Sequence, residues 1–516
     1  MSSKSNMNSF YNWLPLWITS FYLLLKSDRP ISGLHPWKQA DSLAQIDISS
    51  RLLDYPSIFH DYAGSLIFWD TPIYQALIGS VSKLSSLDPL LLARYVNVLL
   101  LIATCFFCIR VFSLVFDSFS TFWFLLFLSS NPFILHYFAT PLPDLFAIFL
   151  GFFGVYLYWY TPKARFGSLF YTLPIFLLFS LATIIKSPIG FYVFILHLSL
   201  LFYSKAINNH VVNFKYNLLY LGTPILFLAF LVEKLRSSFL STGDSVSSFW
   251  ERNPLLYFGG ISDRFSFEVV TTYFKRFILF GGEFSLYRVL FGLFVVLLLA
   301  GAIFYSLYIR RIFFSLLNPS LVYIFVFAGR NLELDYYQLP LFFSFACLLS
   351  YIALYYQNCF LNRFLRPFFE RYPSFNFFIP IFLSVMFVAM IPYLDRLSFR
   401  YHSLDPLLEF RSNNSFIKSV STYSLDLLEV DKKADLHVFS NLRNSSIGAF
   451  TRSKISNYSH NFLIDNCSPL TIKQGPVILH VAFVKSSIPS TCINTIISSS
   501  SDYLETPNYI AWINNK

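Results

Sequence analysis

Charged residues are scarce in this chain of 516 residues. Only 13% of its residues are charged, whereas an ordinary soluble domain carries roughly 25%. Hydrophobic residues make up 55% of the sequence, and 63 of them are phenylalanine. Water cannot be the main solvent of such a chain, because too few polar side chains are present to cover a soluble surface. The composition therefore excludes an ordinary soluble globular protein.

Cysteine is also scarce, and the basic residues form no stripe. Six cysteines in so long a chain exclude the disulfide framework of a small secreted domain. Cys467 and Cys492 lie in the polar tail, where they could pair. The formal charge of +10 does not indicate a nucleic-acid partner, because the basic residues lie between hydrophobic segments rather than along one face.

Long apolar segments recur along the chain, and roughly 20 such residues suffice to cross a bilayer. Hydropathy predicts about eleven transmembrane helices. They lie near 10–26, 89–110, 119–137, 144–160, 168–185, 189–204, 216–233, 285–308, 312–328, 337–356 and 376–394. The first segment lacks a small-residue cleavage site, so we expect it to be retained as a helix. The predicted fold class is an all-α polytopic membrane protein.

The distribution of basic residues predicts the orientation of these helices. If the amino terminus is cytoplasmic, the short outward connections hold few basic residues, chiefly Lys186 and Arg330. The inward connections hold Lys4, Arg110, Lys163, Arg165, Lys205, Lys215, Arg310, Arg311, Arg363, Arg366 and Arg371. Basic residues concentrate on the cytoplasmic side of membrane proteins. We therefore expect a multi-pass protein of the plasma (inner) membrane, with 27–88, 234–284 and the tail outside.

Three outer segments interrupt the apolar runs. Segment 27–88 spaces apolar residues like one helix face in Ser42–Leu53 and again in Pro72–Leu84, so we expect two helices lying on the membrane surface. Segment 234–284 is too polar to span. In the tail, 436–440 and 476–484 have the length and pattern of strands. These features predict a transmembrane domain at 1–394 and a small extracytoplasmic α/β domain at 395–516.

Five short motifs lie on the predicted outer side. The first two are His35-Pro36-Trp37-Lys38-Gln39-Ala40-Asp41 and Phe68-Trp69-Asp70-Thr71-Pro72-Ile73-Tyr74. The others are Pro141-Leu142-Pro143-Asp144, Ile185-Lys186-Ser187-Pro188 and Asp335-Tyr336-Tyr337-Gln338-Leu339-Pro340. In residues and in order, the set resembles the GT-C glycosyltransferases. It is most similar to the dolichyl-phosphate-mannose protein mannosyltransferases and the lipid A aminoarabinose transferases, over about residues 8–205 and locally over 330–345.

The resemblance implies a GT-C-like fold and an inverting glycosyltransferase. Its donor would be a sugar on polyprenyl phosphate, and its acceptor a lipid, polysaccharide or protein of the cell envelope. Asp41 stands where the family has its catalytic acid. The residues that would bind substrate are His35, Trp37, Gln39, Asp70, Tyr74, Asp144, Lys186, Tyr336, Tyr337 and Gln338.

The resemblance also raises the question of a divalent metal ion, for which Asp70 and Asp144 are the candidate ligands. The chain departs from the family at two points. The family often has Glu at the place of Asp70, and 234–284 contains no histidine of the kind that helps to hold metal in the lipid A enzymes. Metal dependence therefore stays open.

The chemistry explains why these residue types are needed. When an acceptor hydroxyl displaces a lipid phosphate from a sugar, a base must take the hydroxyl proton and a cation must stabilise the departing phosphate. We expect Asp41 to be the base and Lys186 the partner of the phosphate. The lipid tail of the donor would stay in the bilayer while its head group meets the acceptor.

Each of these residues also has a structural explanation. Asp41 could cap a helix that begins at Ser42. Asp144 follows Pro143 at a helix start, where the helix dipole favours an acid. Lys186 could be a snorkelling lysine near the membrane surface. Trp37, Trp69, Tyr336 and Tyr337 could belong to an interfacial aromatic belt.

A transporter or flippase of a lipid-linked glycan is the alternative function. Such a protein would carry ionisable residues deep within several spans, and its spans would form paired repeats. In this chain the notable charges lie at predicted outer helix ends. The pattern favours the enzyme.

Overall fold

The computed structural model describes most of the predicted helical part and short pieces of the tail. The described residues are 3–25, 27, 36–51, 71–116, 119–161, 169–208, 286–329 and 335–357, with pieces of 260–273, 381–390 and 436–514 and the single positions 222, 228, 231 and 359. The chain divides into two compact units, one made of 1–28 and 93–401 and the other of 29–92 and 402–516. The division into domains at 1–394 and 395–516 stays a prediction.

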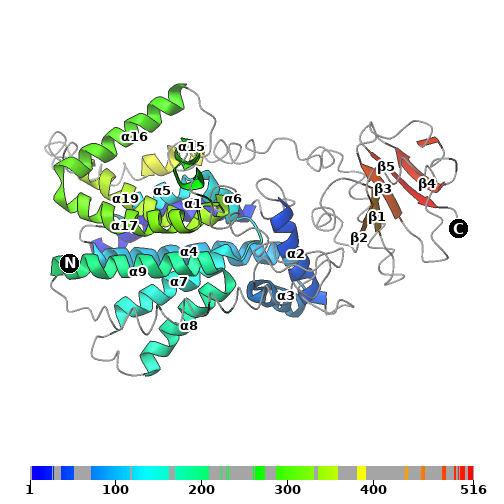
Figure 1. Cartoon of the computed structure of the whole chain (residues 1–516), viewed down its shortest axis with the longest axis horizontal. Coiled ribbons are helices and arrows are strands. Elements are labelled where there is room, and N and C mark those ends of the chain that lie inside the picture. The colour runs from blue at the N-terminus through cyan, green and yellow to red at the C-terminus, as the bar shows by residue number, and fades with distance from the viewer. Residues whose placement is uncertain are drawn as a thin grey trace. The chain divides into compact units, whose positions relative to one another are not determined.

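The first unit is a helical bundle (Figure 1). Its described elements are α1 (Ser3–Leu25), α4 (Pro89–Val115, of which 93–115 belong to this unit), α5 (Thr121–Ser129), α6 (Pro132–Tyr137), α7 (Asp144–Tyr160), α8 (Leu169–Ile185), α9 (Ser187–Asn208), α14 (Ser262–Phe265), α15 (Phe267–Tyr273), α16 (Leu286–Tyr305), α17 (Leu307–Val326), the 3-10 helix η4 (Asp335–Gln338) and α19 (Leu339–Tyr356). Helix α7 packs against α8 and α9, and α17 packs against α9, α16 and α19. Helix α5 packs against α1 and α19.

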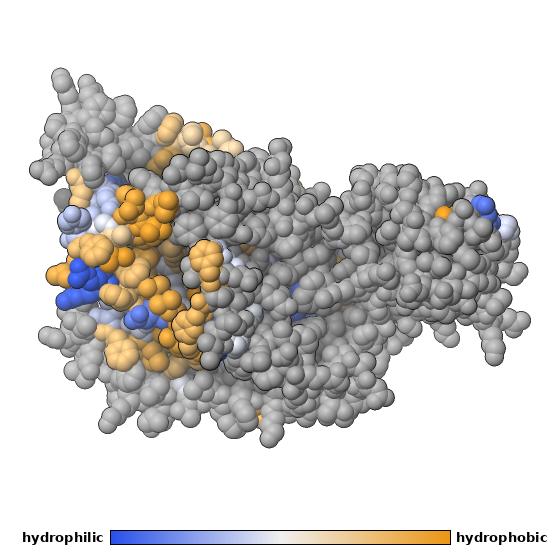
Figure 2. Space-filling model, turned by 45° about the horizontal axis from the view of Figure 1, so that its top comes forward, coloured by the Kyte–Doolittle hydropathy of each residue, from blue (hydrophilic) through white to orange (hydrophobic). Residues whose placement is uncertain are grey.

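These helices are apolar on most of their faces, as segments in lipid must be. Among the described residues, three helices are long and apolar enough to cross a membrane, namely α4, α17 and α19. Shorter apolar helices include α7 and parts of α8, α9 and α16. Large hydrophobic side chains such as Phe304 and Tyr305 are exposed, and Figure 2 shows hydrophobic residues over much of the coloured surface. The chain is a multi-pass membrane protein.

The number of spans stays a prediction, because most of 216–233 lies outside the described residues. One predicted span, 119–137, is not a continuous helix. The segment is divided into α5 and α6, because Pro132 has no N–H group with which to continue the hydrogen bonds of α5. The Asn131 side chain accepts hydrogen bonds from the backbone N–H groups of Phe133 and Ile134 and so caps α6.

The second unit contains two helices that pack on each other, α2 (Pro36–Arg51) and α3 (Ile73–Ser85). Both helices predicted in 27–88 are therefore present, but α2 begins six residues earlier than Ser42. Asp41 lies inside α2, so the explanation of Asp41 as a helix cap is wrong. The two helices approach closely at Gly79, where an added Cβ atom would lie 2.4 Å from the Ser49 Cβ atom.

The outward face of α3 is apolar. Leu77, Val81 and Leu84 recur at helical spacing and are exposed, Leu84 to 86% of its surface. A helix of a soluble protein would turn such residues inward. This stripe supports the prediction that α3 lies on the membrane surface.

The described residues of the tail form a five-stranded mixed sheet, which Figure 1 shows. Its strands are β1 (Leu436–Phe439), β2 (Ile455–Tyr458), β3 (Leu479–Phe483), β4 (Ser500–Glu505) and β5 (Tyr509–Asn514), in the order β2-β1-β3-β5-β4. Strand β1 pairs in parallel with β2 and β3, and β5 pairs antiparallel with β3 and β4. Strands β1 and β3 confirm the two predicted strands. The helical part of the predicted α/β domain stays a prediction.

Candidate active site

Lys186 is the single residue between α8 and α9, and its backbone is hydrogen-bonded to both helices. Its N–H group donates to the carbonyl of Ala182 at 2.9 Å, which closes α8. Its own carbonyl accepts from the N–H groups of Ile189 and Gly190 at 3.0 and 3.1 Å, which opens α9. The backbone of Lys186 is therefore fixed from both sides.

Glycine at position 190 allows α8 and α9 to meet this closely. A Cβ atom at Gly190 would lie 2.3 Å from the Thr183 Oγ1 atom and 2.7 Å from its Cα atom. The second contact is with backbone, which cannot move aside without moving α8. The close approach of the two helices thus depends on the absence of a side chain at Gly190.

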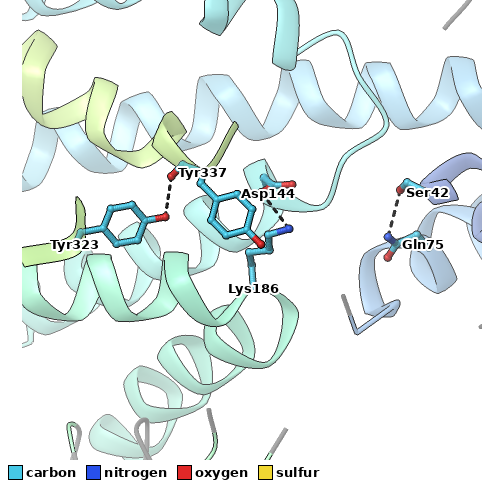
Figure 3. Close-up of polar contacts among 6 residues, drawn as sticks. All are labelled: Ser42, Gln75, Asp144, Lys186, Tyr323 and Tyr337. Carbon is cyan, nitrogen blue, oxygen red and sulfur yellow. Dashed lines mark hydrogen bonds and ion pairs between the residues drawn. The ribbon is translucent and has the colours of Figure 1, made fainter. Parts of the chain in front are cut away.

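Asp144 is the first residue of α7 and lies beside Lys186 (Figure 3). The Asp144 Oδ1 atom is 3.6 Å from the Lys186 Nζ atom, and the side chains are 1% and 3% exposed. Each of these buried charges stabilises the other, because removing either would leave an uncompensated charge inside the protein. The start of α7 further favours the carboxylate of Asp144. Since the Lys186 side chain is buried and ion-paired, the explanation of Lys186 as a snorkelling lysine is wrong.

Tyr337 forms the aromatic side of this site. The Lys186 Nζ atom lies 4.9 Å from the centroid of the Tyr337 ring, within the range of a cation–π interaction. The ring points toward the lysine (Figure 3). Tyr337 is buried, so it does not belong to an interfacial belt. The neighbouring Gln338 is fully buried at the start of α19.

The sequence reasoning missed two tyrosines, of which Tyr323 contacts Tyr337 and Tyr192 contacts Tyr323. The Tyr323 hydroxyl donates to the carbonyl of Tyr337 at 2.7 Å (Figure 3). The Tyr192 hydroxyl shares a hydrogen bond of 2.5 Å with the Ser344 hydroxyl. The centroids of the Tyr192 and Tyr323 rings are 5.3 Å apart. A signal was present, because tyrosine hydroxyls inside apolar spans need partners.

The remaining predicted residues belong to the second unit or have side chains outside the described residues. Gln39 and Tyr74 are buried on α2 and α3. The Gln75 Nε2 atom donates to the Ser42 hydroxyl at 3.2 Å and links these helices (Figure 3). The backbones of Trp37, Asp41 and Tyr336 are helical, but their side chains lie outside the described residues, as do His35 and Asp70 altogether. The roles predicted for these five residues stay predictions.

No metal site is found among the described residues, where no three His, Cys, Asp or Glu side chains gather. Asp70 lies outside these residues, and Asp144 is paired with Lys186. A metal role for Asp70 and Asp144 therefore stays a prediction. What the described site offers is a buried cation between a carboxylate and an aromatic ring.

The chain shares its fold with a known transferase. Neither a protein-family model nor a curated protein matches the sequence. Among solved structures, ArnT from Cupriavidus metallidurans bound to undecaprenyl phosphate matches with a TM-score of 0.60 and 11% sequence identity, over 99% of this chain and 98% of that chain. The apo state of the same protein matches with a TM-score of 0.54 and 11% identity, over 100% and 99% of the two chains.

At this level of identity the match shows a common fold. ArnT is a lipid A aminoarabinose transferase and a GT-C glycosyltransferase. The chain therefore has the GT-C fold, and the resemblance that the sequence motifs indicated is confirmed at the level of the fold.

Proposed function

We propose that this GT-C-fold protein is a glycosyltransferase, which moves a sugar from polyprenyl phosphate to an acceptor of the cell envelope on the outer side of the membrane. The observation that carries the proposal is the buried pair of Lys186 and Asp144, with Tyr337 beside it. Three separate motifs supply these residues. A buried cation at helix ends, within a fold shared with a transferase, suits the recognition of an anionic substrate.

The phosphate of the donor binds beside Lys186. An ammonium group has three N–H donors, so it can hold the Asp144 carboxylate and a phosphate oxygen at the same time. That ArnT binds undecaprenyl phosphate supports a polyprenyl phosphate as the lipid part of the donor. The apolar helices around the site are suited to a lipid tail.

The transfer is a single displacement with inversion. The acceptor oxygen attacks the anomeric carbon on the face opposite the phosphate, and the bond between that carbon and the phosphate oxygen breaks. Asp41 takes the proton of the acceptor hydroxyl. The bonding electrons leave with the lipid phosphate, whose negative charge Lys186 stabilises. Sugar, proton and phosphate are thereby all accounted for.

The other motif residues bind and orient the substrates. Asp70 and Asp144 orient the acceptor, and His35, Trp37, Gln39, Tyr74, Tyr336, Tyr337 and Gln338 line the sugar and acceptor sites. If the reaction needs a divalent metal ion, Asp70 and Asp144 would be its ligands.

A direct assay tests the function. The purified full chain is incubated with a panel of polyprenyl-phosphate sugars and an envelope extract, and consumption of each donor is followed together with release of the polyprenyl phosphate. We expect one donor to be consumed by the parent protein and not by Asp41→Asn. A flippase would instead move a lipid-linked glycan across a proteoliposome membrane without consuming it, and that result would refute the enzyme.

A further inference from the structure

A buried arginine on α4 joins two other helices. Arg94 is only 4% exposed, so its charge lies away from water. Its Nη1 atom donates to the carbonyl of Ser27 at 2.6 Å, just beyond the end of α1. Its Nε atom donates to the carbonyl of Ala139 at 2.8 Å, just beyond the end of α6. Carbonyls at helix ends carry partial negative charge, which favours a guanidinium there.

Asn97 lies three residues further along α4 and holds the next carbonyl of the same turn. Its Nδ2 atom donates to the carbonyl of Thr140, and the Asn97 side chain is fully buried. Residues three apart share a face of a helix. Arg94 and Asn97 thus bind the consecutive carbonyls of Ala139 and Thr140.

The chain from this turn to the ion pair is short and stiff. Only Pro141, Leu142 and Pro143 separate Thr140 from Asp144. Proline fixes φ near −65° and restricts the residue before it, so this link has few ways to bend. All three linking residues are buried. A shift of the Thr140 carbonyl therefore passes along the backbone to the Asp144 carboxylate.

We propose that Arg94 and Asn97 are positioning residues, which hold the turn at Ala139 and Thr140 so that the Asp144 carboxylate stays beside the Lys186 ammonium. The inference deepens the proposed function, because it rests on Asp144 and Lys186 forming the substrate site. The described contacts of Arg94 and Asn97 are with the backbone carbonyls of Ser27, Ala139 and Thr140. Their effect on transfer passes through Asp144.

The test compares Asn97→Ala with a matched control on the same helix. Thr104 is also fully buried, but its hydroxyl donates to the Leu100 carbonyl, one turn back on α4. Thr104→Val therefore removes a buried hydrogen bond without touching the turn at 139–140. Arg94→Lys is a second variant, which keeps the positive charge but lacks the fork that binds two carbonyls at once.

The first readout needs no substrate. The full-chain protein in detergent is treated with formaldehyde and a borane reductant, and methylation of Lys186 is followed by mass spectrometry. A lysine that is buried and ion-paired reacts slowly. Loss of the Asn97 hydrogen bond should raise the methylation rate roughly twofold to tenfold, toward that of Asp144→Asn, while Thr104→Val stays near the parent.

The second readout is the transfer rate in a double-mutant cycle. If Asn97 acts through Asp144, adding Asn97→Ala to Asp144→Asn should change the rate by less than about twofold, although Asn97→Ala alone lowers it by more. Thr104→Val should have the same effect in both backgrounds.

The two readouts separate the two proposals. Faster methylation in Asn97→Ala or Arg94→Lys but not in Thr104→Val supports the positioning role, even if no polyprenyl-phosphate sugar is consumed, in which case the proposed function alone fails. Methylation of Lys186 at the parent rate in both variants overturns the positioning role, whatever the transfer assay shows.

Discussion

Replacement of Lys186 by alanine has two effects whose magnitudes can be separated. The change removes the cation that compensates the buried Asp144 carboxylate, and breaking such a pair costs about 3–5 kcal/mol of stability. It also removes the partner of the donor phosphate, and losing a charged hydrogen bond costs roughly 1.5–3 kcal/mol, or about tenfold to a hundredfold in affinity. The single variant Lys186→Ala should therefore be both less stable and a poorer binder.

A double variant separates the two effects. Lys186→Ala with Asp144→Asn removes both charges, so most of the lost stability should return, whereas the affinity for the phosphate should stay reduced. The assay measures the melting temperature in detergent and the dissociation constant of undecaprenyl phosphate, the molecule that ArnT binds. If the single and the double variant bind undecaprenyl phosphate as tightly as the parent, Lys186 does not recognise the phosphate and the proposed donor site is wrong.

Three further predictions concern the proposed base Asp41, the junction between α8 and α9, and the membrane topology. Asp41→Asn should lower the transfer rate by about 10²–10⁴ without loss of donor binding, and a well-folded variant that keeps more than about a tenth of the parent rate would exclude Asp41 as the base. Gly190→Ala should destabilise the protein by about 1–3 kcal/mol and weaken donor binding, because its methyl group would meet the Thr183 backbone. The control Gly154→Ala, whose Cβ atom would lie 3.3 Å from the Phe179 ring, should lower the melting temperature less. Equal losses of melting temperature in the two variants would contradict the reasoning. A reporter fused after Lys516 should be active only outside the cytoplasm, and a cytoplasmic signal would show that the span count or the orientation is wrong.

Much of the helical unit was predictable from the sequence, because lipid requires long uniform apolar runs and leaves few alternatives. The break between α5 and α6 was visible as Asn131-Pro132, a cap followed by a residue that favours a first helical position. In the tail, β1 and β3 have apolar patterns, while β4 has the polar sequence SSDYLE and pairs with β5 at the edge of the described sheet. Pairing partners decide the identity of such a strand, and these are not local in the sequence.

The candidate site, too, was predictable only in part from the sequence. Motif order pointed to Asp144, Lys186 and Tyr337, and the structure brings all three together. Tyr323 and Arg94 could not be found by motif, since each acts on a backbone carbonyl rather than on a recognisable side chain. The carbonyl that Arg94 binds at Ser27 lies 67 residues away in the sequence. Such a contact exists only once the helices have assembled.

A single residue joins α8 to α9, so Lys186 connects the two helices rigidly and also carries the buried ammonium group of the candidate site. Its backbone is bonded to both helices, so no flexible loop can absorb a change in the angle between them. The ammonium that lies beside Asp144 is carried by this same residue. The angle between α8 and α9 and the place of the ammonium are therefore coupled through one residue.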